Sequence, residues 1–130
     1  MITGVGVDLV SVKRVQQMLD RFGSKFTSRA FSEMEIRDSL RYKNAHAVAR
    51  HFAKRFAAKE AYVKATGLGF GRGISMKSVS VYNDALGKPR IAVSGDVEQN
   101  IELSLSDDGE YAIAFVVLHS RSPVNPVTQV

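Results

Sequence analysis

The sequence predicts a single α+β domain, with helices in its first half and antiparallel strands mainly in its second half. Two observations support this prediction. Residues 45–65 are rich in alanine and contain Lys, Glu and Arg, all strong helix formers, until Gly67 ends the segment. Residues 79–118 contain short runs of alternating apolar and polar side chains, separated by turn residues. With 130 residues and 45% apolar side chains, the chain is suited to one domain with its own core.

A short apolar strand is predicted at residues 2–7. Gly4 and Gly6 interrupt it, and because glycine has no side chain they permit either a close backbone approach or a bulge. Asp8 directly follows the predicted strand. Its carboxylate is explained either by a turn or helix-capping role or by a role in a functional site.

Three helices are predicted between this strand and Gly67. Ser11 can cap a helix over residues 12–22, whose core stripe would be Val12, Val15, Leu19 and Phe22. Ser32 and Glu35 form a capping box for a second helix, which should end near residues 42–44. The long helix follows at residues 45–65, with one stripe formed by Val48, Phe52, Phe56 and Val63.

Four charged residues flank the stripe of the long helix. Glu60 and Lys64 lie one turn apart along one edge, and Arg55 and Lys59 lie along the other. Such side chains can face a cleft while their stems pack inside. The same pattern is typical of an ordinary amphipathic helix, in which a Glu–Lys pair contributes about 0.2–0.5 kcal/mol. The spacing alone therefore leaves both interpretations open.

The second half is predicted to form two hairpins. The glycine-rich segment 67–73 is not a Walker phosphate loop, because no Gly-Lys-Ser/Thr sequence ends it. Strands are expected at residues 79–82 and 91–93 around a turn at 83–89, and at 101–105 and 111–118 around Asp107, Asp108 and Gly109. The domain would then cover residues 1–118, and residues 119–130 would form a loose tail.

The composition favours an anionic partner. The formal charge is +5 with a pI near 9.7, and the basic residues are concentrated before residue 72. A nucleic acid, a phosphate-rich cofactor or an acidic protein would each match this charge. The absence of cysteine excludes disulfides and thiolate chemistry from the chain itself. Without a signal segment or a run long enough to span a membrane, we expect a cytoplasmic protein with no membrane partner.

Two motifs resemble those of one enzyme superfamily. The segment Arg-Phe-Ala-Ala-Lys-Glu-Ala at residues 55–61, followed by Lys64, Ala65 and Gly67, closely resembles the signature of the 4′-phosphopantetheinyl transferases. The segment Gly-Val-Gly-Val-Asp-Leu-Val at residues 4–10 is similar to the other metal-binding motif of that superfamily. The motifs occur in the expected order, the resemblance extends to about residue 118, and the length is similar to the short type of the superfamily.

This resemblance implies a fold, a reaction and a metal. The fold would pack a long central helix on a small antiparallel sheet. The reaction would transfer 4′-phosphopantetheine from coenzyme A to a serine of apo-acyl carrier protein, releasing adenosine 3′,5′-bisphosphate and serving fatty acid biosynthesis. Asp8 and Glu60 would hold Mg²⁺, which prefers oxygen ligands. Lys64 matches a phosphate-contacting lysine, and Glu60, directly or through a metal-bound water, is the candidate acceptor of the serine proton.

The resemblance also suggests residues that bind coenzyme A. Arg55 resembles a position associated with the 3′-phosphate, although a surface arginine would have the same spacing. The turn at 83–89 resembles a segment near the adenosine, which makes Asn83, Gly87, Lys88 and Pro89 candidates. Gly87 and Pro89 are equally explained as turn residues. Lys59 is interpreted either as a cofactor-site residue or as a side chain whose stem packs against the apolar stripe.

The carrier protein and a second copy of the chain are the macromolecular partners that the resemblance implies. The face formed by Arg14, Met18, Arg21 and Phe22 is the candidate for the acidic carrier, although it could equally be a solvated helix face. Larger members of the superfamily resemble two such units fused, with the site between them. A single-unit chain should therefore assemble its site between subunits, and the resemblance to the short type implies a homotrimer.

Two departures from the family pattern and two alternative functions remain. Asp107 occupies the position where many relatives carry histidine, which puts a histidine contact to the cofactor in doubt, and the segment 93–101 is shorter than in many relatives. A basic nucleic-acid-binding module would explain the charge, but no helix-turn-helix, zinc or RNA-recognition signature accompanies it, so we expect no nucleic acid partner. A non-catalytic binding protein is the other alternative, and the intact Asp8, Glu60 and Lys64 argue against it.

Overall fold

The structure is a computed structural model that describes residues 1–70, 74–97 and 100–120 of the 130-residue chain. Strand β1 (Ile2–Ser11) is followed by helices α1 (Val12–Phe22), α2 (Ser24–Ala30), α3 (Glu33–Ser39) and α4 (Ala45–Thr66). The 3₁₀ turn η1 (Met76–Ser78) then leads into strands β2 (Val79–Asn83), β3 (Pro89–Val93), β4 (Asp96–Val97), β5 (Ile101–Asp107) and β6 (Tyr111–His119).

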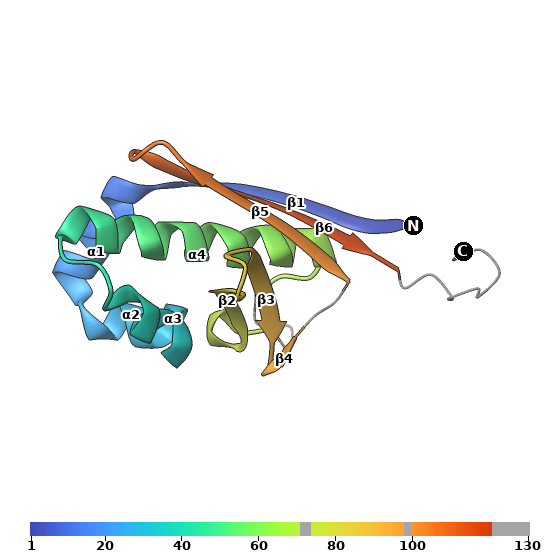
Figure 1. The fold of residues 1–130 in the computed structure, drawn as a ribbon, viewed down its shortest axis with the longest axis horizontal. Helices are drawn as coiled ribbons and strands as arrows, with labels where there is room; N and C mark the ends of the chain where they lie inside the picture. The colour runs from blue at the N-terminus through green and yellow to red at the C-terminus, as the bar shows by residue number, and fades with distance from the viewer. Residues whose placement is uncertain (71–73, 98–99, 121–130) are drawn as a thin grey trace.

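The long helix α4 is the centre of the molecule. An antiparallel sheet with the strand order β1-β6-β5 covers one side of it. Helices α2 and α3 and the second sheet, β2-β3-β4, lie on its other side (Figure 1). The predicted α+β fold, with a long central helix on a small antiparallel sheet, is thus confirmed. No helix among the described residues is long and apolar enough to cross a membrane.

Strand β1 lies almost directly on the backbone of α4. A Cβ atom added to Gly6 would lie 1.9 Å from the carbonyl oxygen of Ala61, and one added to Gly4 would lie 2.0 Å from that of Ala65. The helix face beneath the sheet is formed by small residues, Ala57, Ala58, Ala61 and Ala65. Of the two readings of these glycines, the close approach is therefore confirmed at both positions, and a register irregularity also occurs between Ile2 and Gly4.

Most predicted element boundaries are confirmed because they depend on local caps and turns. The side chain of Ser11 accepts a hydrogen bond from the Arg14 amide at 3.2 Å, and Ser32 and Glu35 form the expected capping box. The long helix covers Ala45–Thr66 and ends at Gly67, whose φ of 74° is left-handed. Both predicted hairpins are present, β2–β3 and β5–β6.

Three predictions about elements are wrong. Strand β1 continues to Ser11, so Asp8 lies inside the strand opposite Ala114 and does not follow its end. Helix α3 ends at Ser39 and not near residues 42–44. Helix α2 was not predicted, because its seven residues are too few to show a helical period and Gly23, with a φ of 52°, separates it from α1.

Helix α4 is buried on most of its circumference, so the prediction of one apolar stripe with charged edges is also wrong. His51, Arg55 and Lys59 are all buried, together with most of its alanines. The reason is that the sheet covers one side of the helix while α1, α2, α3 and β2 pack against the rest. Which residues of this helix are buried therefore depends on tertiary contacts, and the helical periodicity of its own sequence does not predict those contacts.

Asp107 joins the end of β5 to α4. One carboxylate oxygen lies 2.8 Å from Nζ of Lys54, and the other lies 3.8 Å from Nε of Arg50 and accepts the amide of Gly109 at 3.2 Å. Desolvation alone would raise the pKa of Asp107, but the hydrogen bond and charge of Lys54, with Gly109 and Arg50, lower it overall. Asp107, which the resemblance predicts to stand where many relatives carry histidine, thus has partners within the fold.

The predicted tail and two predicted loop segments are only partly covered by the described residues. Strand β6 reaches His119, which places the first residue of the predicted tail in the sheet. Residues 121–130 of that tail lie outside the described residues, as do 71–73 of the glycine-rich segment and 98–99 of the short segment 93–101.

Candidate functional site

A cleft with two connected arms lies between β1, α1, α2 and α4. The smaller arm, called here the acidic arm, has a volume of about 380 Å³ and is lined by residues that include Asp8, Arg14, Met18, Phe56 and Glu60. The larger arm, called here the basic arm, has a volume of about 620 Å³ and is lined by residues that include Lys25, Arg29, Ala30, Phe70 and Met76. Both arms share Met18, Phe26, Phe56 and Glu60. Glu60 therefore lies where the two arms meet.

The structure brings Asp8, Glu60 and Lys64 together at the acidic arm. Side chains alternate along a strand, so Asp8 points to the same side of β1 as Gly4 and Gly6, toward α4. Nζ of Lys64 donates to Oδ1 of Asp8 at 3.0 Å and to the carbonyl oxygen of Val7 at 3.1 Å. The Asp8 side chain is 17% exposed and that of Lys64 is 55% exposed. The three predicted catalytic residues therefore share one partly open site.

The charges at this site interact. Partial burial, and then the negative charge of Asp8, raise the pKa of Glu60, while the ammonium of Lys64 lowers it. Within the described residues no group of three or more His, Cys, Asp or Glu side chains could hold a metal ion. Two neighbouring carboxylates can nevertheless bind a hard cation when phosphate oxygens and water supply the other ligands. The donor set therefore fits Mg²⁺ together with a phosphorylated substrate, and such a cation would offset the repulsion between Asp8 and Glu60.

The structure contradicts the prediction that Lys59 binds the cofactor. Its side chain is 0% exposed. Its ammonium donates to the carbonyl oxygens of Ala30 at 2.9 Å and Met76 at 2.8 Å and pairs with the carboxylate of Glu35. Because three acceptors engage the three donors of an ammonium group, none remains for a phosphate.

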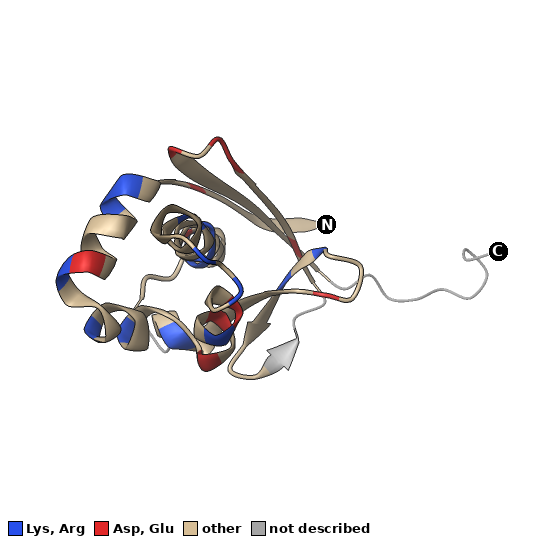
Figure 2. Ribbon diagram, turned by 60° about the vertical axis from the view of Figure 1, so that its left-hand side comes forward, with Lys and Arg blue, Asp and Glu red and all other residues tan. Residues whose placement is uncertain are grey.

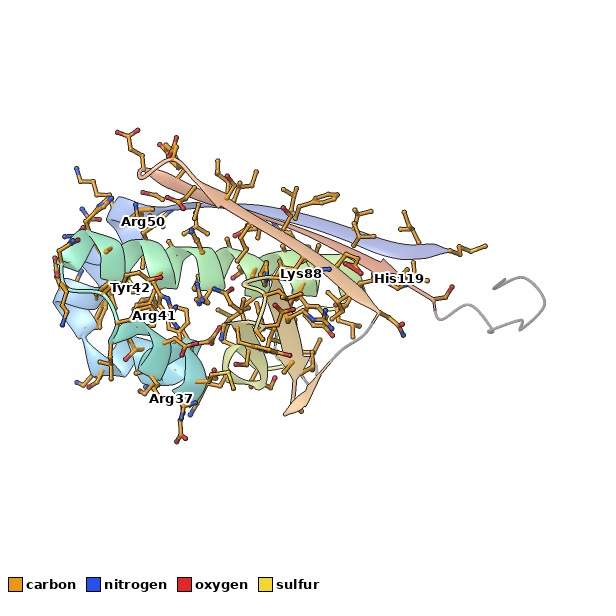
Figure 3. All side chains as sticks on the ribbon, viewed as in Figure 1. Arg37, Arg41, Tyr42, Arg50, Lys88 and His119 are labelled. Carbon is orange, nitrogen blue, oxygen red and sulfur yellow. The ribbon has the colours of Figure 1, made fainter. Side chains whose placement is uncertain are left out.

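Arg55 lies on a different side of α4 from Glu60. It is buried, and the charged or polar side chains that act on it are Glu35, Tyr42, Asp38 and Arg41, in or next to α3. Its Nε has no hydrogen-bond partner among the described residues, and burial lowers its pKa. Figure 3 shows Arg41 and Tyr42 beside α3. Arg55 lines neither arm of the cleft.

The predicted adenosine segment also lies away from the cleft. Asn83 and Pro89 end β2 and begin β3, and the turn between them contains Gly87 with a φ of 84°. Lys88 is exposed at this turn, where its Nζ lies 3.4 Å from the Glu102 carboxylate (Figure 3). Within one protomer, the structure thus separates the predicted coenzyme A residues from Asp8, Glu60 and Lys64.

The predicted carrier-binding face borders the cleft. Arg14 and Met18 line the acidic arm, Met18 and Phe22 line the basic arm, and the guanidinium of Arg21 lies 5.2 Å from the centre of the Phe22 ring. Met18 and Phe22 are 40% and 42% exposed. Lysine and arginine are frequent on the helices around this region (Figure 2).

Sequence reasoning missed two basic residues of the cleft, Lys25 and Arg29. Both lie on α2 and line the basic arm with Phe26. They were missed because α2 itself was not predicted. Their separation of four residues, with Phe26 between them, was the available signal, since residues four apart share a helix face.

Comparisons with known proteins found a matching family model and similar sequences. The family model described as the 4′-phosphopantetheinyl transferase superfamily matches residues 4–116. A holo-[acyl-carrier-protein] synthase of Anaplasma marginale (strain St. Maries) is 85% identical over 119 residues, which cover 92% of this chain and 99% of the relative. One of Anaplasma phagocytophilum (strain HZ) is 60% identical over 122 residues, covering 92% of this chain and all of the relative.

Solved structures are similar as well. The crystal structure of a holo-(acyl-carrier-protein) synthase from Bacillus anthracis in complex with CoA (3′,5′-ADP) has a TM-score of 0.81 and 37% identity, covering 93% of this chain and 99% of that one. The synthase of Helicobacter pylori in complex with coenzyme A has a TM-score of 0.74 and 29% identity, covering 88% of this chain and 99% of that one.

Proposed function

The chain belongs to the 4′-phosphopantetheinyl transferase superfamily and, within it, to the holo-[acyl-carrier-protein] synthases, and from this premise we propose its reaction. It transfers 4′-phosphopantetheine from coenzyme A to a serine of apo-acyl carrier protein, requires Mg²⁺, and serves fatty acid biosynthesis in the cytoplasm. The observation that supports the proposal most strongly is the joint position of Asp8, Glu60 and Lys64 at the edge of the cleft.

The residues at the acidic arm suit attack on a diphosphate. The serine oxygen must approach the pantetheine-side phosphorus, and the negative charge of the diphosphate must be offset. Asp8 and Glu60 would hold the Mg²⁺, which supplies Lewis-acid and charge-neutralising chemistry when bound. Lys64 would contact a phosphate oxygen, and its 55% exposed side chain beside Asp8 supports this role. Glu60, directly or through a metal-bound water, is the proposed acceptor of the serine proton.

The positions of the residues predicted to bind coenzyme A support a site that is shared between protomers. Arg55 and the turn at 83–89 are proposed to bind the 3′-phosphate and adenosine of coenzyme A. In one protomer they lie away from the cleft that contains Glu60. We therefore propose that a neighbouring protomer completes each site, in a homotrimer.

The outer face of the β1-β6-β5 sheet supports this assembly. Val5, Val7 and Leu9 of β1, with Ile113 and Phe115 of β6, are between 41% and 63% exposed. They form a continuous apolar face, because side chains two apart on a strand share a side and Val7 pairs with Phe115 across the strands. A large exposed apolar patch of this kind is typical of a protein–protein interface.

Phe115→Glu should therefore convert the oligomer into monomers. The substitution places a charge at the centre of the apolar face, where burial without a partner is unfavourable. Light scattering coupled to size-exclusion chromatography would measure the mass, and Leu40→Glu, at a 76% exposed leucine away from the sheet, is the matched control. A wild-type protein that is monomeric, or a Phe115→Glu variant that remains trimeric, would contradict the proposed assembly.

The proposed reaction is tested by the intact mass of an apo-acyl carrier protein incubated with this protein, coenzyme A and Mg²⁺. We expect a gain of one phosphopantetheine, and we expect EDTA to abolish it. A folded protein that modifies none of several carrier proteins would contradict the proposal. A gain that persists in EDTA would contradict the metal requirement alone.

A further inference from the structure

An internal ion pair lies beneath the basic arm of the cleft. Lys59 of α4 and Glu35 of α3 pair with both side chains 0% exposed, and Nζ of Lys59 lies 5.1 Å from the centre of the Phe31 ring. Lys59 immediately precedes Glu60 in the chain. Neither side chain of the pair lines the cleft.

The hydrogen bonds of this pair reach two wall segments of the basic arm. The ammonium of Lys59 donates to the carbonyl oxygens of Ala30, at the end of α2, and of Met76, at the start of η1. Both Ala30 and Met76 line the basic arm. One buried side chain therefore fastens two wall segments of this arm to the helix that carries Glu60.

Glu35 extends the same network to two more segments. Oε1 accepts the amide of Ser32 at 2.9 Å, and Oε2 accepts the amide of Val81 in β2 at 3.0 Å. Together the two side chains connect α2, α3, η1 and β2 to α4, and α2, α3 and β2 lie below α4 in Figure 1.

Stability alone is a weak explanation for such a pair. Removing two charges from water is costly, and apolar side chains of similar volume are often equally or more stable in the same place. What an apolar pair would not reproduce is the hydrogen bonding to the carbonyls of Ala30 and Met76. The network therefore fixes the positions of Ala30 and Met76 in the wall of the basic arm.

We propose that Lys59 and Glu35 are positioning residues that set the shape of the basic arm and thereby orient the docked carrier protein relative to Glu60. This inference rests on the proposed function, because it takes the carrier protein as the ligand of the basic arm. The charge of Lys25 and Arg29 in this arm is complementary to an acidic carrier. Arg55 and the turn at 83–89 do not line this arm, so loss of the Lys59 hydrogen bonds to Ala30 and Met76 should affect the carrier protein more than coenzyme A.

The double variant Glu35→Gln with Lys59→Met tests the proposal. It removes both charges together, so that no unpaired charge stays buried, and it leaves the carbonyls of Ala30 and Met76 without their donor. We expect KM for apo-acyl carrier protein to rise at least about tenfold, because small misplacements of bound groups have large kinetic effects. KM for coenzyme A should rise by a smaller factor, because the variant also removes the Glu35 charge that acts on Arg55. A purely structural role would lower the active fraction, and hence kcat, without this difference between the substrates.

A second pair between an α4 lysine and a carboxylate of another element provides the control. Lys54→Met with Asp107→Asn removes the pair between Lys54 of α4 and Asp107 of β5, 2.8 Å apart, and neither residue lines an arm of the cleft. If this control raises KM for the carrier as much as the double variant does, or if the double variant leaves that KM unchanged, the proposal is wrong. Wild-type transfer, measured alongside, tests the proposed function separately.

A second variant applies if the double variant does not fold. Lys59→Arg keeps the charge beside Glu35 but replaces the compact ammonium with a larger, planar group. We expect a folded protein whose KM for the carrier is raised while KM for coenzyme A is unchanged. A folded Lys59→Arg protein with wild-type values of both constants would overturn the proposal.

Discussion

Glu60→Gln should lower kcat/KM for phosphopantetheine transfer by at least about 10²- to 10³-fold, the usual effect of removing one electrostatic group from a transition state. It should also raise the melting temperature of the protein. The loss of transfer follows from the proposed roles of Glu60 in holding Mg²⁺ and accepting the serine proton. The gain in stability follows from the electrostatics of the unliganded site, where burial and the charge of Asp8 both oppose ionisation of Glu60.

The stability effect has a defined dependence on pH. The folded-state pKa of Glu60 is raised, so between the unfolded and folded pKa values the native state binds more protons than the unfolded state. The contribution of Glu60 to the free energy of unfolding therefore falls as pH rises through this window. Above the window Glu60 is ionised and destabilising, and Glu60→Gln should then be more stable than wild type. Below the ordinary glutamate pKa the two proteins should differ little.

Thermal unfolding at several pH values, with and without Mg²⁺, measures both effects. In the presence of coenzyme A, whose phosphates would supply further ligands, Mg²⁺ should raise the melting temperature of the wild type and have little effect on Glu60→Gln, since a ligand stabilises the state that binds it. The control is Glu33→Gln, at an exposed glutamate of α3. A Glu60→Gln protein that transfers at the wild-type rate would refute the assignment. A Glu60→Gln protein that is less stable than the wild type at neutral pH would refute the proposal that the ionised Glu60 carboxylate destabilises the unliganded fold.

Gly6→Ala should both destabilise the protein and sharply reduce transfer. The new Cβ would lie 1.9 Å from the Ala61 carbonyl oxygen, a distance that no real contact allows, so β1 must move away from α4. Overpacking of this kind costs about 1–3 kcal/mol or more. Asp8 is two residues further along the same face of β1 and would move away from Glu60 and Lys64. A displacement of about 1 Å at a reacting site can reduce the rate about 100-fold.

Denaturant unfolding and the transfer assay together test this prediction. Gly69→Ala is the matched control, because a Cβ there would meet nothing within 4 Å and its φ is not positive. Gly4→Ala should act as Gly6→Ala does on stability, since its Cβ would lie 2.0 Å from the Ala65 carbonyl oxygen. If Gly6→Ala unfolds and transfers as the wild type does, the close contact between β1 and α4 does not position Asp8.

Local chemistry explains which elements could be predicted. The caps at Ser11 and Ser32 and the stop at Gly67 depend on residues within one helical turn, and all three are present in the structure. The hairpin turns were predictable for the same reason. Helix α2 has seven residues and owes its place to contacts such as that between Phe26 and the buried Phe31, which a short window does not reveal.

The sequence by itself determined the long helix and the relative directions of its side chains, because 100° per residue places Glu60 and Lys64 on one side and Arg55 on another. It also determined, through its resemblance to a known family, which residues to examine. Only the tertiary structure decided that Asp8 reaches Lys64 from within β1, that Lys59 is an internal residue paired with Glu35, and that Arg55 lies away from the cleft. The physical reason is that burial and contact depend on which distant segments cover each side of α4, and that choice is made by packing across the whole fold.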